Sequence, residues 1–168
     1  MSVEPDFSLH PGPALARAAA QDLFERTATM LRSLLPASAD IRHIGATAIP
    51  GCLTKGDLDI VVRVEAADFA GADAALAALF ARNTGSTHSD TFSSFESDGT
   101  SPHLGVQLTV IGAPGDFFHT FAEALTRDPD LLTRYNALKR QFDGHPMDDY
   151  RAAKSAFITS VLHGAECS

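Results

Sequence analysis

Two neighbouring stretches decide the fold: HIGATAIPG at residues 43–51 and KGDLDIVV at residues 55–62. The first contains the turn formers Gly45, Pro50 and Gly51, which predict a tight loop after a strand that begins near residue 40. The second passes from a turn into β-branched and apolar residues, which predicts a buried strand over residues 58–64. The pattern strand, loop, strand therefore forms the centre of the domain.

Two carboxylates stand at the start of the second strand. Side chains alternate along a strand, so Asp57 and Asp59 point to one face, roughly 6 to 7 Å apart at about 3.3 Å per residue. Mg²⁺ takes carboxylate oxygens together with substrate phosphates, and two such residues can share a metal pair. The spacing predicts a Mg²⁺ site on Asp57 and Asp59. The alternative is that one aspartate only caps the turn before the strand.

The loop itself suits phosphate. Glycine lets backbone N–H groups approach phosphate oxygens closely, so Gly45 and Thr47 are the candidate phosphate-binding residues. Lys55 stands two residues before Asp57, where its ammonium either neutralises a phosphate or is an ordinary surface charge.

Two lysines on the predicted C-terminal helices are further candidates for holding phosphate, Lys139 and Lys154. Lys154 falls between Tyr150 and Phe157 in an apolar stripe. Its ammonium therefore either reaches the edge of the helix or meets an anion inside a cleft.

These residues resemble a known superfamily. A glycine loop followed by Asp-hydrophobic-Asp-hydrophobic resembles the signature of the polymerase-β-type nucleotidyltransferases. More narrowly, HIGATAIPG with the following Lys55 resembles the GrpB family, a compact branch that is also found fused to dephospho-CoA kinases. The resemblance continues through DPDL, YNALKR and YRAAKSAF in the last third and covers residues 13–163. It implies an α+β fold, a small mixed β-sheet covered by helices from both ends of the chain, and Mg²⁺-dependent nucleotidyl transfer.

The chain departs from the superfamily pattern at two places. Ala46 stands where a serine often holds a phosphate oxygen, and Thr47 replaces that hydroxyl only if the loop turns it inward. The third carboxylate, which helps to activate the attacking hydroxyl, is matched by Gln107. Its amide is a possible ligand contact that can ligate weakly through the carbonyl, but it cannot take a proton. Glu96, on the preceding predicted strand, either replaces that carboxylate or is an exposed charge at the end of a hairpin.

The remaining pattern predicts one domain over residues 13–168, preceded by an extended or loosely docked arm over residues 1–12. Apolar periodicity predicts helices at residues 13–35, 65–83, 117–127, 128–142 and 147–163, and strands at residues 91–96 and 103–111. Asn83 and Gly85 form the expected stop of the second helix. The polar residues of strand 103–111 should lie on the open face of the sheet, together with the two aspartates.

Composition restricts the partners. Thirteen Lys and Arg against twenty-one Asp and Glu give a net charge of -8, which repels nucleic acid and anionic lipid, so we expect neither as a partner. Cys52 and Cys167 form no metal-binding spacing and suit a reducing cytoplasm, and no leader or membrane span is evident. Cys52 has no basic neighbour in sequence and is not expected to be a nucleophile. His43 and His103, on predicted strands, are either structural or ligand contacts.

Three hypotheses follow. In the first, the chain is a Mg²⁺-dependent nucleotidyltransferase that uses a nucleoside triphosphate and the hydroxyl of a small molecule. In the second, the same fold binds a nucleotide or a CoA-type cofactor without catalysis. In the third, it is a protein-interaction domain whose aspartates are structural.

Overall fold

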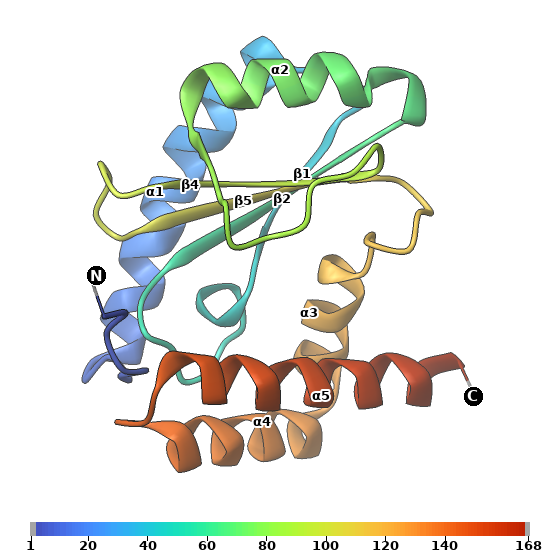
Figure 1. Ribbon diagram of the computed structural model, residues 1–168. Helices are drawn as coiled ribbons and strands as arrows, with labels where there is room; N and C mark the ends of the chain where they lie inside the picture. The colour runs from blue at the N-terminus through green and yellow to red at the C-terminus, as the bar shows by residue number, and fades with distance from the viewer. Residues whose placement is uncertain (1–2, 167–168) are drawn as a thin grey trace.

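The fold is a mixed β-sheet with helices on both of its faces. The structure is a computed structural model that describes residues 3–166. Its strands lie in the order β1-β2-β5-β4-β3, with α1 and α2 on one side and α3, α4 and α5 on the other (Figure 1). The prediction of an α+β fold with a small mixed sheet is confirmed.

The bounds of the elements follow the sequence pattern closely. In chain order they are α1 Pro13–Leu34, β1 Asp40–Ile44, the 3-10 turn η1 Ala46–Ala48, β2 Leu58–Val64, η2 Ala66–Asp68, α2 Phe69–Leu79, β3 Ala81–Arg82, β4 Phe92–Ser97, β5 Leu104–Val110, α3 Phe118–Arg127, α4 Pro129–Phe142 and α5 Met147–Glu166. The run Asp128-Pro129-Asp130 is typical of a helix start, and Asp128 caps α4: its carboxylate accepts hydrogen bonds from the N–H groups of Asp130 and Leu131.

The strand of the two aspartates is central. β2 pairs antiparallel with β1 and parallel with β5, and the register sets Asp59 beside Ile44 on one side and Gly105 on the other. Alternate apolar residues of β2 and β5 face α1 and α2, where they are almost completely buried. Asp59 therefore lies on the opposite face, beneath the C-terminal helices.

That second face is covered only in part: Gly105 and Gln107 keep some exposure, as the sequence led us to expect, whereas Thr109 does not. Helices α3, α4 and α5 lie on this side of the sheet (Figure 1), and α3 contacts β1. Thr109, expected at an open surface, has no exposed area and donates a hydrogen bond to Asp116 in the turn before α3. The alternation of β5 was read correctly, but alternation alone does not show that a polar face is covered as well.

The predicted end of the second helix is wrong. Helix α2 ends at Leu79, Phe80 is extended, and Ala81 and Arg82 pair with β4 at the edge of the sheet. Neither Asn83 nor Gly85 takes the left-handed conformation expected of a helix stop. Strand pairing satisfies the backbone there, and Arg82 is held by two hydrogen bonds to the carboxylate of Asp73.

The segment before α1 runs against the C-terminal helices. Phe7 is 1% exposed, and its ring stacks on Tyr150 with 3.7 Å between centroids. Its N–H donates to the carbonyl of His145, and the N–H of His10 donates to the carbonyl of Thr54. This segment therefore joins the turn between α4 and α5 to the loop before β2.

Within residues 3–166, no helix is both long and apolar enough to cross a membrane. Cys167 lies outside the described residues.

Candidate functional site

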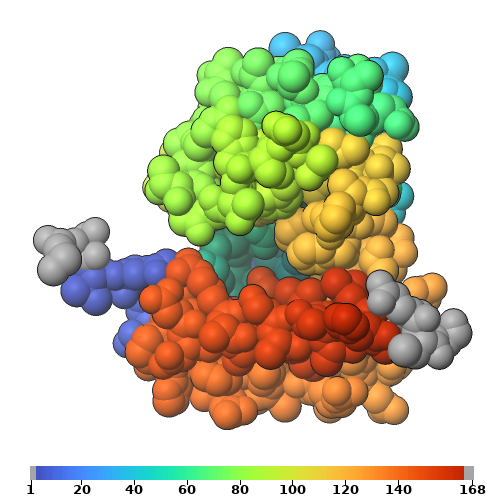
Figure 2. Space-filling view, turned by 45° about the vertical axis from the view of Figure 1, so that its right-hand side comes forward, coloured from blue at the N-terminus to red at the C-terminus, as the bar shows by residue number. Residues whose placement is uncertain are grey.

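Four of the predicted residues line one cavity. Gly45, Asp59, Gln107 and Lys154 meet where the sheet faces the C-terminal helices, around a volume of about 120 Å³. Figure 2 shows a hollow between α5, in red, and the green and gold segments above it, with the first half of the chain at its base. The tertiary structure thus joins a loop, two parallel strands and the last helix at one place.

Two glycines make room for the carboxylate of Asp59. A Cβ atom on Gly45 would lie 2.6 Å from one carboxylate oxygen, and a Cβ atom on Gly105 would lie 3.0 Å from the other. Gly45 also has a φ of 75°, which side chains other than glycine rarely adopt. The loop sequence therefore requires glycine for its own shape and for the position of Asp59.

The Asp59 carboxylate has no internal partner. It accepts no hydrogen bond and forms no ion pair with any residue in the described range. Burial raises its pKa, Lys154 opposes that rise, and the charge of Asp57 adds to it. A partly buried carboxylate without a donor is costly, so this group is set to meet a cation or a hydrogen-bond donor from a ligand.

The two lysines of the C-terminal helices lie near it. Lys154 lines the cavity and forms no direct ion pair within the described part of the chain. Lys139 is 3% exposed, with its ammonium 4.6 Å from the ring centre of Tyr135 and 5.7 Å from that of Tyr150. Burial lowers the pKa of Lys139 to about 8. Both ammonium groups oppose the rise in the pKa of Asp59 that burial causes, but only Lys154 lines the cavity, and Lys139 is buried behind it.

Asp57 faces a different hollow. Its carboxylate pairs with the ammonium of Lys55 at 2.9 Å. Both residues, with His10 and His103, line a wide hollow of about 500 Å³ at the N-terminal end of α1. The ring of His103 is held by the carboxylate of Asp98 at 2.8 Å. Asp57 and Asp59 therefore do not line one cavity, although the sequence led us to expect both carboxylates on one face.

His43 and Thr47 support the loop from behind. The two nitrogens of His43 each lie 2.9 Å from an oxygen, one on Gln21 and one on Thr47. The hydroxyl of Thr47 donates to the backbone carbonyl of Asp57, and Thr47 is 1% exposed. These side chains lie on the α1 side of the loop, and the structure does not bring them to the cavity of Asp59.

The position of the third carboxylate is occupied by neutral residues. Gly105 is the β5 partner of Asp59, and Gln107 lies one alternate position further along the same face. Glu96 pairs with Gly105 from β4, but its carboxylate lies 3.9 Å from His103 and is 39% exposed. In residues 3–166, no three His, Cys, Asp or Glu side chains are arranged to hold a metal ion.

The donor set suits a metal that is shared with a ligand. Asp57 and Asp59 supply carboxylate oxygens, and Mg²⁺ in phosphate sites commonly takes one or two carboxylates plus substrate oxygens and water. The unpartnered carboxylate of Asp59 fits that role. Asp57 fits it after its oxygen is released from Lys55. A site made of protein ligands alone does not fit.

The sequence did not reveal two features of the site: the aromatic side chains that line the cavity, and the hydrogen bonds by which α4 holds the loop. Phe117, Phe118, Phe121 and Tyr135 line the cavity, although their spacing predicted only buried helix faces. Asn136 of α4 accepts a hydrogen bond from Leu53 N–H and donates to the carbonyl of Gly51. The nearby Cys52 is 4% exposed and burial raises the pKa of its thiol, as expected for a structural cysteine.

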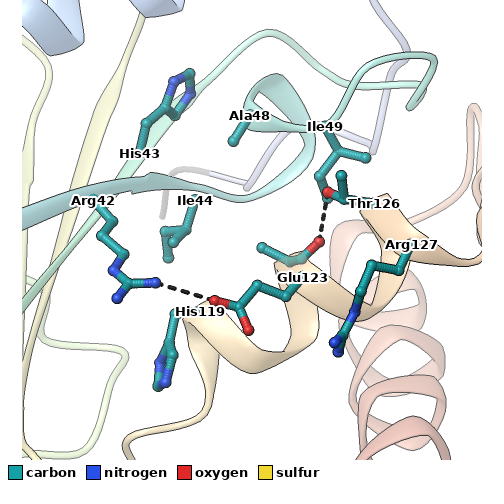
Figure 3. Close-up of a pocket in the computed structure, with 10 residues that line it drawn as sticks. Arg42, His43, Ile44, Ala48, Ile49, His119, Glu123, Thr126 and Arg127 are labelled. Carbon is teal, nitrogen blue, oxygen red and sulfur yellow. Dashed lines mark hydrogen bonds and ion pairs between the residues drawn. The ribbon is translucent and has the colours of Figure 1, made fainter.

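A second hollow lies outside β1. It has a volume of about 320 Å³, and Arg42, His119 and Glu123 are among its lining residues (Figure 3). Arg42 donates hydrogen bonds to Asp40 and, at 3.1 Å, to Glu123. Because these charges are already paired, this hollow is a weaker candidate than the cavity of Asp59.

The architecture defines the class first: this is an α+β domain with a five-stranded mixed sheet and helices on both of its faces. The crystal structure of the conserved protein GrpB from Enterococcus faecalis has the same fold, with a TM-score of 0.70 and 22% sequence identity over 88% of this chain and 92% of that chain. The Cid1 poly(U) polymerase bound to MgATP is more distant, with a TM-score of 0.48 and 12% identity over 78% of this chain and 41% of its own, and adds nothing to that assignment.

The sequence then gives the family. The family model of the GrpB protein matches residues 16–163. UPF0157 protein VC_A0354 of Vibrio cholerae is 32% identical over 146 residues, which cover 87% of this chain and 77% of the relative. This chain belongs to the GrpB family, as its central motif indicated.

Proposed function

We propose that the chain is a Mg²⁺-dependent nucleotidyltransferase that moves a nucleotidyl group from a nucleoside triphosphate to the hydroxyl of a small molecule. The observation that carries the proposal is the carboxylate of Asp59. Gly45 and Gly105 leave room for it, and it accepts no hydrogen bond within the described residues. It lies at a cavity that is also lined by Lys154, whose ammonium forms no ion pair there. A purely structural aspartate is normally hydrogen-bonded.

The roles of the residues follow from their positions. Asp57 and Asp59 would hold Mg²⁺, which supplies positive charge to the phosphates when it is bound. Lys154 and Lys139 would counter the remaining phosphate charge, and the N–H groups near Gly45 would contact phosphate oxygens. Lys55 can leave Asp57 for a phosphate. An acidic chain of net charge -8 favours a small acceptor over a nucleic acid, and the cytoplasm, where both substrates occur, stays its expected location.

The second candidate is a domain that binds a nucleotide or a CoA-type cofactor without turnover. The observation that favours it is the neutral pair Gly105 and Gln107 where a third carboxylate is expected. Neither residue can accept the proton of an attacking hydroxyl. Binding and turnover therefore have to be measured separately.

The first test is a thermal-shift panel of the four nucleoside triphosphates and CoA, each with Mg²⁺ and with chelator. A ligand at one hundred times its Kd should stabilise the chain by about 2.7 kcal/mol. We expect a Mg²⁺-dependent response that is lost in Asp59→Asn. The matched control is Asp22→Asn, whose side chain is 71% exposed on α1 and should leave the response unchanged.

Pyrophosphate release by the responding nucleotide separates the two candidates. Release in wild type supports transfer. Binding without release, together with a gain of release in Gln107→Glu, supports a binding domain that has lost its base. If no nucleotide or CoA stabilises wild type with or without Mg²⁺, both candidates fail and the interaction-domain hypothesis is favoured.

A further inference from the structure

The cavity beside Asp59 is small and mostly apolar. Its walls are contributed by β1, the loop, β2, β5, α3, α4 and α5, and its volume is about 120 Å³. The apolar lining consists of Ile44, Ala46, Ile49, Phe117, Phe118, Phe121, Tyr135 and Ile158. An engineered cavity of roughly 150 Å³ with Leu, Ile and Phe walls binds benzene. This space is therefore of the size of one ring and too small for a whole nucleotide.

The aromatic wall is fixed by contacts among its own rings. Phe117 and Phe118 stack with 4.5 Å between centroids, and Phe121 meets Tyr135 edge to face at 5.5 Å. Phe118 also stacks on Phe92 of β4 at 6.2 Å. Because each ring is held by another, the cavity is formed before any ligand arrives, which lowers the entropic cost of binding.

Three polar groups meet at this apolar space without internal partners. Neither the carboxylate of Asp59, the amide of Gln107 nor the ammonium of Lys154 forms a hydrogen bond with another residue in the range 3–166. An apolar pocket with a few convergent polar groups is the usual form of a small-molecule site. The polar groups require a ligand that donates to a carboxylate and exchanges hydrogen bonds with an amide.

The position of Gln107 indicates which ligand this is. It lies on β5, on the side of Asp59 where the third carboxylate of a nucleotidyltransferase would meet the attacking hydroxyl. We propose that this cavity is the acceptor subsite and that the acceptor is a compact neutral alcohol of about one ring. Its body lies among Phe117, Phe121 and Ile158, and its hydroxyl donates to Asp59 and accepts from Gln107. The assignment of this ligand as the acceptor rests on the proposed function. The assignment of its chemical class, a neutral alcohol with one ring, rests only on the cavity.

The experiment uses three probes on the whole chain: benzyl alcohol, toluene, which lacks the hydroxyl, and glycerol, which lacks the ring. Binding is followed by amide NMR shifts of Gly45 and Gly105, the two glycines that contact Asp59. We expect benzyl alcohol to bind at least tenfold more tightly than either of the others. Equal binding of all three, or no shift at either glycine, would overturn the proposal.

Two substitutions in the cavity, with one control, test whether the ligand binds there. Ile158→Trp fills the cavity and should abolish binding of benzyl alcohol, whereas Leu162→Trp, one turn further along α5 and outside the lining, should not. Gln107→Leu keeps the shape and should reduce the preference for benzyl alcohol over toluene to less than threefold. This second variant tests the proposal even if Ile158→Trp fails to fold.

Nucleotide binding separates this proposal from the proposed function. If Ile158→Trp loses benzyl alcohol but keeps the Mg²⁺ nucleotide response, the two subsites are distinct, as proposed. If it loses both, the cavity is part of the nucleotide site and the acceptor assignment is wrong. If wild type binds benzyl alcohol at the glycines but no nucleotide, the proposed function fails while the ligand class stands.

Discussion

Two carboxylates lie on the α3 side of the sheet: Asp59 at the start of β2, and Asp116 in the turn before α3, beside Arg63 near the end of β2. Their surroundings differ. Asp116, near Arg63, is 4% exposed and receives hydrogen bonds from Arg63 at 2.6 and 2.8 Å and from Thr109. Burial raises its pKa, but the bonds from Arg63 and the N–H of Gly112 outweigh that effect and hold the pKa at about 2. Asp59 has no such donor, and its pKa is raised.

The difference separates structure from function. Arg63 also bonds Asp40, and Arg42 continues the network to Glu123 on α3. This closed network fixes α3 on the sheet, so the aromatic residues at the start of α3 reach the cavity of Asp59. The carboxylate of Asp116 is hydrogen-bonded by the protein itself, whereas that of Asp59 has no donor within residues 3–166.

The largest expected loss of stability comes from removing the ion pair between Arg63 and Asp116. Arg63→Met should destabilise the fold by about 3 to 5 kcal/mol, because it leaves the buried charge of Asp116 without its partner. Chemical denaturation measures the change. Arg26→Met, which removes an ion pair with 65% and 71% exposed partners, should cost at most about 1 kcal/mol and serves as the control. Equal losses in the two variants would contradict the contrast drawn between buried and exposed pairs.

The most informative comparison makes the same substitution, aspartate to asparagine, at Asp116 and at Asp59. Asp116→Asn should cost about 2 kcal/mol because it weakens charge-assisted hydrogen bonds. Asp59→Asn, measured in chelator, should instead stabilise the chain by about 1 kcal/mol because it removes a buried charge. Opposite signs in paired denaturation curves are the expected result. A loss of stability in both would show that Asp59 has a structural partner.

The last prediction concerns the dependence of stability on pH that His43 should cause. Burial lowers the pKa of His43 to about 4, below its usual value of 6.5, so folding favours the neutral ring. The associated stability is fully present above about pH 6.5 and is lost as the pH falls toward 4.

The loss should be about 2 kcal/mol once the partial exposure of the ring is allowed for. His43→Gln should flatten this part of the pH curve, which is measured by denaturation at pH 7.0 and 4.5. An unchanged slope in the variant would assign the pH dependence to other groups.

The sequence predicted the elements well because local signals agreed with the tertiary fold. The apolar alternation of β2 and β5, the Asp128 cap and the glycine loop all act over a few residues. One error, the end of α2, arose where a two-residue strand at the sheet edge competed with a helix stop. Such a short pairing has no periodicity of its own to detect.

The residues of the candidate site were also indicated in part by local signals. Spacing indicated Asp57, Asp59 and Gly45, and an apolar stripe interrupted by a charge indicated Lys154. Spacing did not show that Lys55 pairs with Asp57, nor that Thr47 turns toward His43. These contacts depend on how a thirteen-residue loop folds against α1, and the loop has no repeating pattern to define its direction.

The sequence by itself determined the family, the strand of the two aspartates and the need for glycine beside them, because each is written in a short run of neighbouring residues. Only the tertiary structure decided that α3, α4 and α5 cover the face of Asp59 and bring Lys154, Gln107 and a wall of aromatic rings to it. Those groups come from segments up to about a hundred residues apart, and packing between elements is a property of the whole chain rather than of any stretch of it.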